Sequence, residues 1–116
     1  MSEETCLFCK IVAGEIPAAT VHEDELVIAI DDINPVAPVH QLLIPRRHVE
    51  SAAQLAESDA EMLGRLFAVA AKLAADAGLP ASGYRLVTNV GVDGGQSVPH
   101  LHVHLIGGRR MAWPPG

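Results

Sequence analysis

Residues 99–106 (PHLHVHLI) constrain the fold of this 116-residue chain most, because three histidines alternate with apolar residues there. The side chains of a β-strand point to opposite faces with a period of two. As a strand, the segment presents His100, His102 and His104 on one face and leucine and valine on the other. As a helix, the same residues would scatter around the axis without an apolar stripe. The pattern therefore predicts a strand with one chemical face.

Composition limits the size of the fold and the choice of partners. A chain of this length forms one domain with a modest core, and because only 3% of its residues are aromatic, that core is mostly aliphatic. A net charge of −6 argues against binding to nucleic acid, although a small phosphorylated ligand needs only a few donors. We expect no signal peptide and no membrane contact. With two neighbouring cysteines and no disulfide framework, a cytoplasmic setting is expected.

Alternating apolar residues between turn signals predict four further strands, over residues 19–22, 26–30, 39–45 and 84–90. The first two form a hairpin around an acidic turn. Asp31 and Asp32 follow the second strand, where two carboxylates could bind a metal, accept hydrogen bonds from sugar hydroxyls or simply be solvated. His40 shares a face of the third strand with Leu42. Taken alone, His40 and His48 are ordinary surface or hydrogen-bonded histidines.

Two helices are expected. Residues 6–13 carry an apolar face and end at Gly14, a favourable C-terminal stop. Ser58 and Glu61 match a capping box, which predicts a helix over about residues 59–77. The apolar stripe of this second helix recurs at helical spacing and is predicted to be core rather than a cofactor site. The stripe consists of Met62, Leu63, Leu66, Phe67, Ala70, Leu73 and Ala74.

Cys6 and Cys9 form a C-x-x-C pair inside the first predicted helix. Such a pair can be half of a zinc site, a redox dithiol or two small core residues. No strand precedes it, which disfavours a thioredoxin-like dithiol. Because no second C-x-x-C exists, a zinc site would need histidines as its other ligands. Taken alone, the pair slightly favours a core role.

The loop and the tail that flank the histidine strand are also informative. Residues 91–97 (GVDGGQS) contain two successive glycines, which can turn backbone N–H groups toward one point and form an anion-binding nest. The same loop could be a plain hairpin connection. Residues 107–116 carry the only tryptophan, Trp113, which we expect to pack against something, such as a partner subunit.

Three interpretations of the histidine strand compete. Three incidental histidines are improbable, given their identical facing. The second interpretation is a three-histidine metal site, as in catalytic zinc enzymes. Nucleophilic catalysis at phosphorus is the third, because an imidazole nitrogen is both a good nucleophile and a fair leaving group at neutral pH. Residue chemistry alone leaves the second and third interpretations open.

The histidine strand resembles the His-φ-His-φ-His-φ-φ signature of the histidine triad family, where φ is apolar. The resemblance covers nearly the whole chain. Within the family, the chain is similar to the Hint-type branch in particular. Pro99 departs from that branch, which commonly has a bulky residue there, and no family contact through that amide is carried over. The other matching segments are residues 6–11, 15–17, 32–35, 37–48, 94–98 and 107–116, together with Asn89.

The resemblance implies a purine nucleoside phosphoramidase or a related nucleotidyl hydrolase. His102 would attack the α-phosphorus of an AMP or GMP derivative, and the backbone carbonyl of His100 would set the tautomer of His102. A covalent nucleotidyl-His102 would then be hydrolysed without any metal. The implied phosphate contacts are His104, Asn89, Gly95 and Ser97, with Ser97 also near the leaving group.

The resemblance also implies how the nucleoside is bound. Asp32 would accept hydrogen bonds from the ribose hydroxyls. Apolar residues would sandwich the base, namely Leu7, Phe8, Ile11, Ile16, Ile30, Ile33 and Leu42.

Bacterial members similar to this chain carry a structural zinc ion, and its implied ligands here are Cys6, Cys9, His48 and His100. Sulfur and imidazole ligands in a closed tetrahedral set suit zinc. The site would pin the N-terminal helix to the histidine strand.

The implied fold is α+β, a five-stranded antiparallel sheet with one long helix and a short N-terminal helix, over residues 1–116 as a single domain. Two subunits would join their sheets into a homodimer, with residues 107–116 near the active site. Two alternative functions stay open. They are a dinucleoside polyphosphate hydrolase and a nucleotide-binding interaction module with incidental activity.

Overall fold

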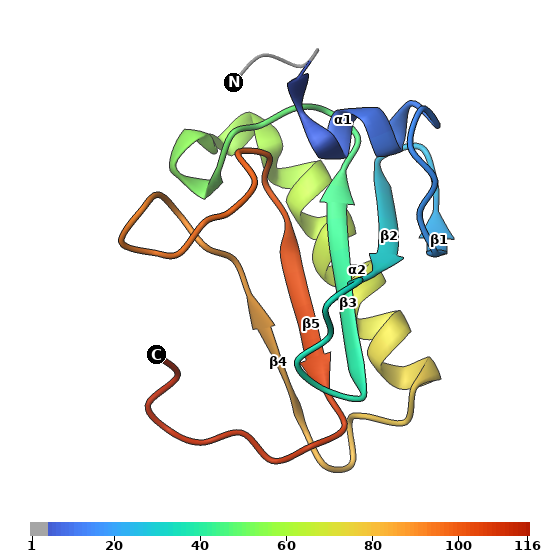
Figure 1. Ribbon diagram of the computed structural model, residues 1–116, viewed down its shortest axis with the longest axis vertical. Coiled ribbons are helices and arrows are strands. Elements are labelled where there is room, and N and C mark those ends of the chain that lie inside the picture. The colour runs from blue at the N-terminus through green and yellow to red at the C-terminus, as the bar shows by residue number, and fades with distance from the viewer. Residues whose placement is uncertain (1–4) are drawn as a thin grey trace.

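Five antiparallel strands form one sheet in the order β1-β2-β3-β5-β4, as the computed structural model in Figure 1 shows. The structure describes residues 5–116. This arrangement confirms the predicted α+β fold, with one long and one short α-helix in the described part of the chain. In chain order the elements are α1 (Leu7–Val12), β1 (Thr20–Glu23), β2 (Val27–Asp31), β3 (Val39–Pro45), η2 (Ala52–Gln54), η3 (Glu57–Asp59), α2 (Ala60–Asp76), β4 (Tyr84–Val87) and β5 (Val103–Gly107).

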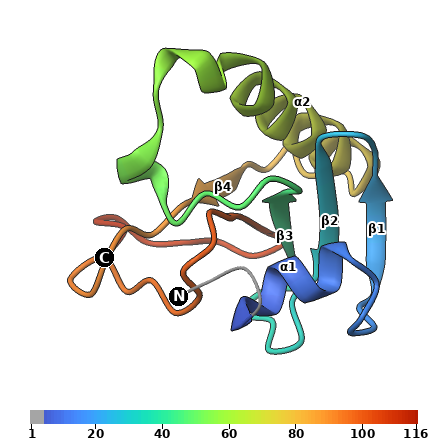
Figure 2. The same cartoon turned by 90° about the horizontal axis from the view of Figure 1, so that it is seen from above.

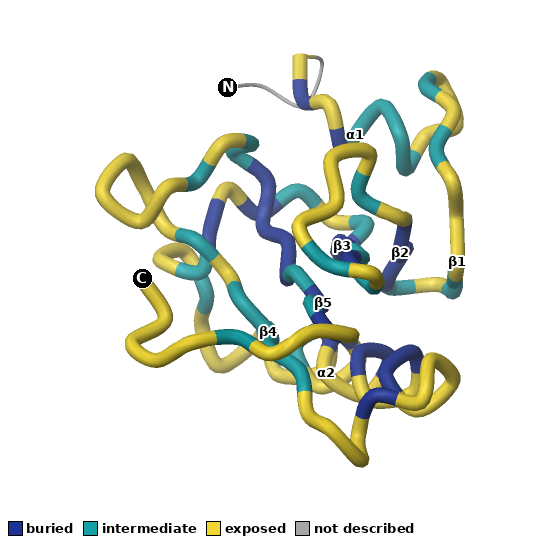
Figure 3. Tube along the Cα trace, turned by 60° about the horizontal axis from the view of Figure 1, so that its bottom comes forward, coloured by how far each residue is buried: buried dark blue, intermediate teal, exposed yellow. Residues whose placement is uncertain are grey.

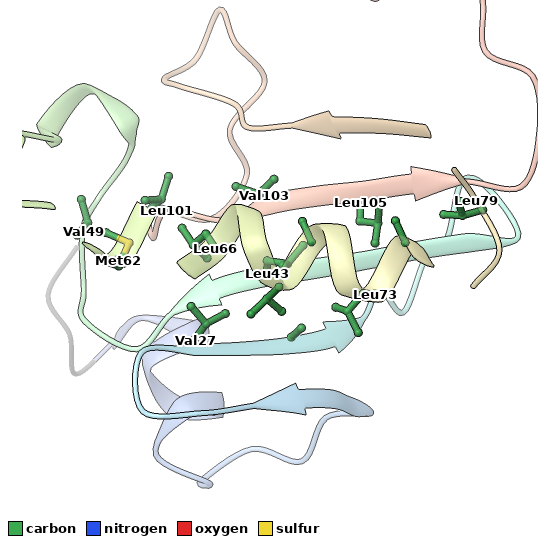
Figure 4. Close-up of a cluster of buried hydrophobic side chains, with 14 residues drawn as sticks. Val27, Leu43, Val49, Met62, Leu66, Leu73, Leu79, Leu101, Val103 and Leu105 are labelled. Atoms are coloured by element: carbon green, nitrogen blue, oxygen red, sulfur yellow. The ribbon is translucent and has the colours of Figure 1, made fainter. Parts of the chain in front are cut away.

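The two α-helices cover opposite faces of the sheet (Figure 2). On the α2 face, Leu66 and Leu73 of the helix pack against Leu43 and Leu105 of the sheet (Figure 4). On the other face, Phe8 of α1 packs with isoleucines and leucine of β2 and β3. Because β2 and β3 are covered on both faces, most of their residues are apolar and buried.

The histidine strand is shorter than predicted. β5 pairs with β3 from Val103 onward, so His100 and His102 lie ahead of the strand. Pro99 has no N–H to donate, and the His100 N–H donates to Val98 O at 2.8 Å instead of to a ladder partner. The predicted alternation nevertheless holds, because Leu101, like Val103 and Leu105, joins the α2-side core.

The strand before it is also shorter, because β4 ends at Val87 rather than at residue 90. The next residue, Thr88, uses its hydroxyl, which donates to His102 O at 2.8 Å. A side-chain bond thus replaces the backbone ladder at that point. The strands of the first hairpin, β1 and β2, begin and end one residue later than predicted, and the Asp24 carboxylate closes their turn by accepting the Leu26 N–H at 2.8 Å.

The predicted capping box is wrong. Ser58 lies inside the short 3₁₀ helix η3, and α2 starts after Asp59, whose side chain makes no capping bond to α2. The Asp59 carboxylate is engaged elsewhere, because it accepts the Ala56 N–H at 2.9 Å and an N–H of Arg47. The carboxylate therefore holds the turn that leads into the helix.

The C-terminal end and the buried face of α2 agree with the prediction, apart from one residue of the stripe. Gly78 adopts the left-handed conformation just after the helix, with φ of +72°. Of the predicted stripe, Leu63 is partly buried and Phe67 is 52% exposed, so Phe67 was wrongly assigned to the core. Val69, which the prediction did not include, is buried in its place.

The tail after β5 runs over the surface (Figure 3). The Arg109 guanidinium donates to Val36 O at 2.8 Å, and Arg85 of β4 donates to Ala112 O. Trp113 is 83% exposed, so the packing expected for it does not occur within the described chain. No helix in residues 5–116 combines the length and the apolarity needed to cross a bilayer.

Adjacent residues of α2 offer a matched test of this core. We expect Leu66→Ala to lower the free energy of unfolding by about 2–5 kcal/mol, because the side chain is almost fully buried. Phe67→Ala should cost about 1 kcal/mol or less, because half of the ring faces water. Urea denaturation at low protein concentration measures both, and equal losses would contradict the assigned helix face.

Candidate active site and metal centre

A cavity of about 280 Å³ lies between α1 and the sheet face opposite α2. Its wall is mostly apolar, and the polar residues in it include Asp32, Ser97, His102 and His104. The cavity brings together most of the residues predicted to bind a nucleotide. Those in its lining are Leu7, Phe8, Ile11, Ile16, Ile30, Asp32, Ile33, Leu42, Ser97, His102 and His104.

Two predicted phosphate contacts, Asn89 and Gly95, are not in the lining. The Asn89 side-chain amide donates to Gly94 O at 2.7 Å, and the Gly95 N–H donates to Val92 O at 3.0 Å. Both groups thus make hydrogen bonds within the loop, and their role as phosphate contacts stays a prediction. In the described chain, the amides of Ser97 and Val98 donate to no protein acceptor. Within this loop, Ser97 and Val98 are the residues that line the cavity, so their amides are available to an anion there.

The His102 ring has a fixed orientation and tautomer. Its Nδ1 lies 2.7 Å from His100 O, and since a carbonyl only accepts, Nδ1 carries the proton. The Phe8 ring packs edge-on against it, with ring centroids 5.0 Å apart. Burial lowers the pKa of His102 below its usual value. Its Nε2 is therefore an unprotonated nitrogen with a lone pair at neutral pH.

His104 has the opposite tautomer, and a third histidine sets it. The Val36 N–H donates to His40 Nδ1 at 3.1 Å, so His40 carries its proton on Nε2. That Nε2 lies 2.9 Å from His104 Nδ1, which accepts. Burial, with smaller contributions from His102 and His40, lowers the pKa of His104 to about 4. Neutral His104 thus holds its proton on Nε2.

The sequence prediction did not include His40 in the site. The sequence feature that could have indicated its place is the alternation of His40 with Leu42. This alternation puts both residues on the cavity side of β3, where Leu42 pairs with His104. Asp32, His40 and His104 lie close enough to share a metal ion. However, the Val36 N–H occupies one ring nitrogen of His40 and a proton occupies the other. This cluster is therefore better suited to relaying hydrogen bonds than to binding a metal.

Cys6, Cys9, His48 and His100 converge at the end of α1, as the resemblance implied. The distances from His100 Nδ1 are 3.3 Å to Cys6 Sγ, 3.5 Å to Cys9 Sγ and 3.2 Å to His48 Nδ1. Tetrahedral zinc, with bonds of about 2.0–2.3 Å, separates its ligand atoms by roughly 3.3–3.8 Å. The four side chains therefore fit a zinc ion without rearrangement.

The surroundings of His100 support the same interpretation. Its Nε2 lies 2.8 Å from Pro45 O, so Nε2 carries the proton and Nδ1 directs a lone pair at the cysteines. The ring is fully buried. Cys6 is at the N-cap of α1, so the cluster fixes that helix against the chain that leads to β5.

Comparisons with known proteins agree with this architecture. The family model described as HIT domain matches residues 13–111. A HIT-like protein of Synechocystis is 47% identical over the full length of both chains, and a 14 kDa zinc-binding protein of Zea mays is 48% identical over all of this chain and 91% of its own.

Solved structures give the same result. The crystal structure of a HIT family hydrolase from Legionella pneumophila superposes with a TM-score of 0.95 at 51% identity, covering 97% of this chain and all of that one. A HIT family hydrolase from Clostridium thermocellum gives a TM-score of 0.90 at 50% identity, covering 94% of this chain and 95% of its own. The fold, the site geometry and these likenesses together show that the chain belongs to the HIT domain family.

Proposed function

We propose that the protein cleaves the phosphorus–nitrogen or anhydride bond of purine nucleoside 5′-monophosphate derivatives through a nucleotidyl-His102 intermediate. One observation carries the proposal. Two neighbouring imidazoles in one cavity hold opposite tautomers, with His102 offering a lone pair and His104 offering an N–H. Attack at phosphorus needs both a nucleophile and a donor for the phosphate oxygens. The likeness to HIT family hydrolases supports hydrolysis as the outcome.

In the first step, the Nε2 lone pair of His102 forms a bond to the α-phosphorus, and the bond from phosphorus to the leaving amine breaks. The amine leaves with a proton from solvent. The positive charge that develops on the His102 ring is stabilised by His100 O, which accepts the Nδ1 proton. In the second step, water attacks phosphorus, the bond to Nε2 breaks, and the nucleoside monophosphate and a proton are released.

The cavity wall accounts for binding in this scheme. His104 Nε2–H, the Ser97 hydroxyl and the amides of Ser97 and Val98 would hold the phosphate oxygens. The apolar residues on α1, β2 and β3 would hold the base. Asp32 would accept hydrogen bonds from the ribose hydroxyls through oxygen lone pairs left beside its bond from the Asn34 N–H. Ile33, 92% exposed, would cover the base from the rim of the cavity.

We further propose that Cys6, Cys9, His48 and His100 hold a structural zinc ion. The convergence of their ligand atoms and the likeness to a zinc-binding relative support this. A bound zinc would act as a cross-link between α1 and the segment before β5. The chemistry proposed for His102 needs no metal.

A second copy of the chain is the proposed partner. β4 lies at one edge of the sheet, where its outer backbone groups are open to pairing, and Phe67 is an exposed aromatic residue on α2. Joining two sheets through β4 and covering Phe67 would give a homodimer. In that case the cost of Phe67→Ala would grow with protein concentration.

Replacing the proposed nucleophile should separate turnover from binding. We expect His102→Ala to lower kcat on adenosine 5′-phosphoramidate by about 10³-fold or more, with AMP affinity changed only a few-fold. His22→Ala, which alters a histidine outside the cavity, is the matched control. Full activity of His102→Ala would rule out the mechanism. Faster cleavage of diadenosine polyphosphates would favour that substrate class, and no turnover with tight AMP binding would favour a binding module.

The metal centre is tested by elemental analysis of protein purified without chelators. Wild type and His22→Ala should carry about one zinc ion per chain. His48→Ala should lose most of it and unfold at a lower temperature, because the zinc-bound state is no longer favoured. Metal-free wild type that is as stable as a zinc-reconstituted sample would contradict the proposal.

The lowered pKa of His104 predicts that acidification destabilises the fold. The pKa of His104 is about 4 in the folded protein, against an ordinary value of 6.5. Between these values the unfolded chain binds more protons, so the free energy of unfolding falls as the pH drops from 6.5 toward 4. His104→Gln should therefore lose less stability than wild type between pH 7 and pH 5. Urea denaturation across that range measures this, and equal losses would contradict it.

A further inference from the structure

The Gln96 side chain hydrogen-bonds to three backbone groups, two in its own loop and one at Glu50. Its Oε1 accepts the Gly91 N–H at 3.0 Å. Its Nε2 donates to Glu50 O at 2.7 Å and to Val98 O at 3.0 Å. Both Nε2 protons are thus committed to protein carbonyls, and Gln96 is absent from the cavity lining. The amide is therefore arranged to hold the protein together, not to bind a ligand.

The segment that Gln96 closes is the loop over residues 91–98. Within it, the Gln96 N–H donates to Gly91 O at 3.0 Å, so backbone and side chain of Gln96 both bind Gly91. Gly91 adopts a φ of +68°, which favours glycine, and a Cβ on Gly94 would lie 2.3 Å from Val90 O. The loop thus has one tightly defined path. It ends at Ser97 and Val98, which line the cavity.

Outside its own loop, Gln96 binds the backbone that follows β3, at Glu50 O. Glu50 lies two residues after His48, and the carbonyl of the intervening Val49 accepts the Leu101 N–H at 2.6 Å. Leu101 directly precedes His102. Gln96 therefore ties the loop to the same short segment that anchors the approach to the proposed nucleophile.

We propose that Gln96 is a positioning residue that fixes the amides of Ser97 and Val98 for the phosphate without touching it. Preorganised amides bind an anion more tightly than mobile ones, because less conformational freedom is lost on binding. Base and ribose would contact other parts of the cavity, so their binding should not depend on Gln96. The inference rests on the proposed function in that the ligand is taken to be a nucleoside phosphate.

The test compares AMP with adenosine, because the ratio of their dissociation constants isolates the phosphate contribution. Isothermal titration calorimetry of wild type should show tighter binding of AMP. Gln96→Met, which keeps the length and loses all three side-chain bonds, should reduce that preference by about tenfold or more. Its affinity for adenosine should stay within about twofold. Gln54→Met, the same change at an exposed residue of η2 outside the cavity, should keep the wild-type preference.

A second variant guards against misfolding of the first. Gln96→Glu keeps the shape and the acceptor for Gly91 but loses both donors, so it should also reduce the AMP preference. Elemental analysis should find wild-type zinc content in both variants, because no metal ligand has changed. An unchanged preference in both folded variants would overturn the role of Gln96 alone. If the wild-type protein binds AMP and adenosine equally, both the proposed phosphate site and the role of Gln96 are overturned.

Discussion

His100 is the residue on which the site depends, because each of its polar groups fixes a different part of the fold. Its Nδ1 faces the two cysteines and His48, and its Nε2–H is bound by Pro45 O at the end of β3. Its carbonyl holds the His102 ring. A disturbance of the proposed metal centre would therefore reach the proposed nucleophile through a single peptide unit.

The neighbours of each ring, rather than the histidine pattern itself, decide what each imidazole can do. A carbonyl beside Nδ1 leaves His102 with a free Nε2 lone pair, whereas the N–H of His40 beside Nδ1 leaves His104 with a proton on Nε2. His40 in turn takes its tautomer from the Val36 amide. Two chemically opposite groups thus arise from the same residue type two positions apart.

Periodicity predicted the parts of this structure that a repeating pattern controls. The opposite facing of His102 and Leu101, the two helices and most of the cavity lining follow from apolar spacing and family motifs. Local competition for hydrogen bonds explains most of the failures. Asp59 binds Ala56 and Arg47 instead of capping α2, and the Thr88 hydroxyl bonds to His102 O where β4 was predicted to continue. Phe67 lies at the border of the apolar stripe of α2. Whether a border residue is buried depends on which face of the helix meets the sheet, and apolar spacing alone does not determine this.

The two cysteines and their fully buried histidine partner are far apart in the sequence, with Cys6 and His100 separated by 94 positions. During synthesis, α1 and β2 emerge early, but His100 and β5 emerge only after α2 and β4. Until then the two thiols lack His100, the edge of β3 lacks its partner strand, and the apolar face of α2 lacks Leu101, Val103 and Leu105. A chain that stops before residue 100 therefore carries a paired thiol motif beside an open apolar surface. Such a fragment has the features that chaperones and proteases recognise.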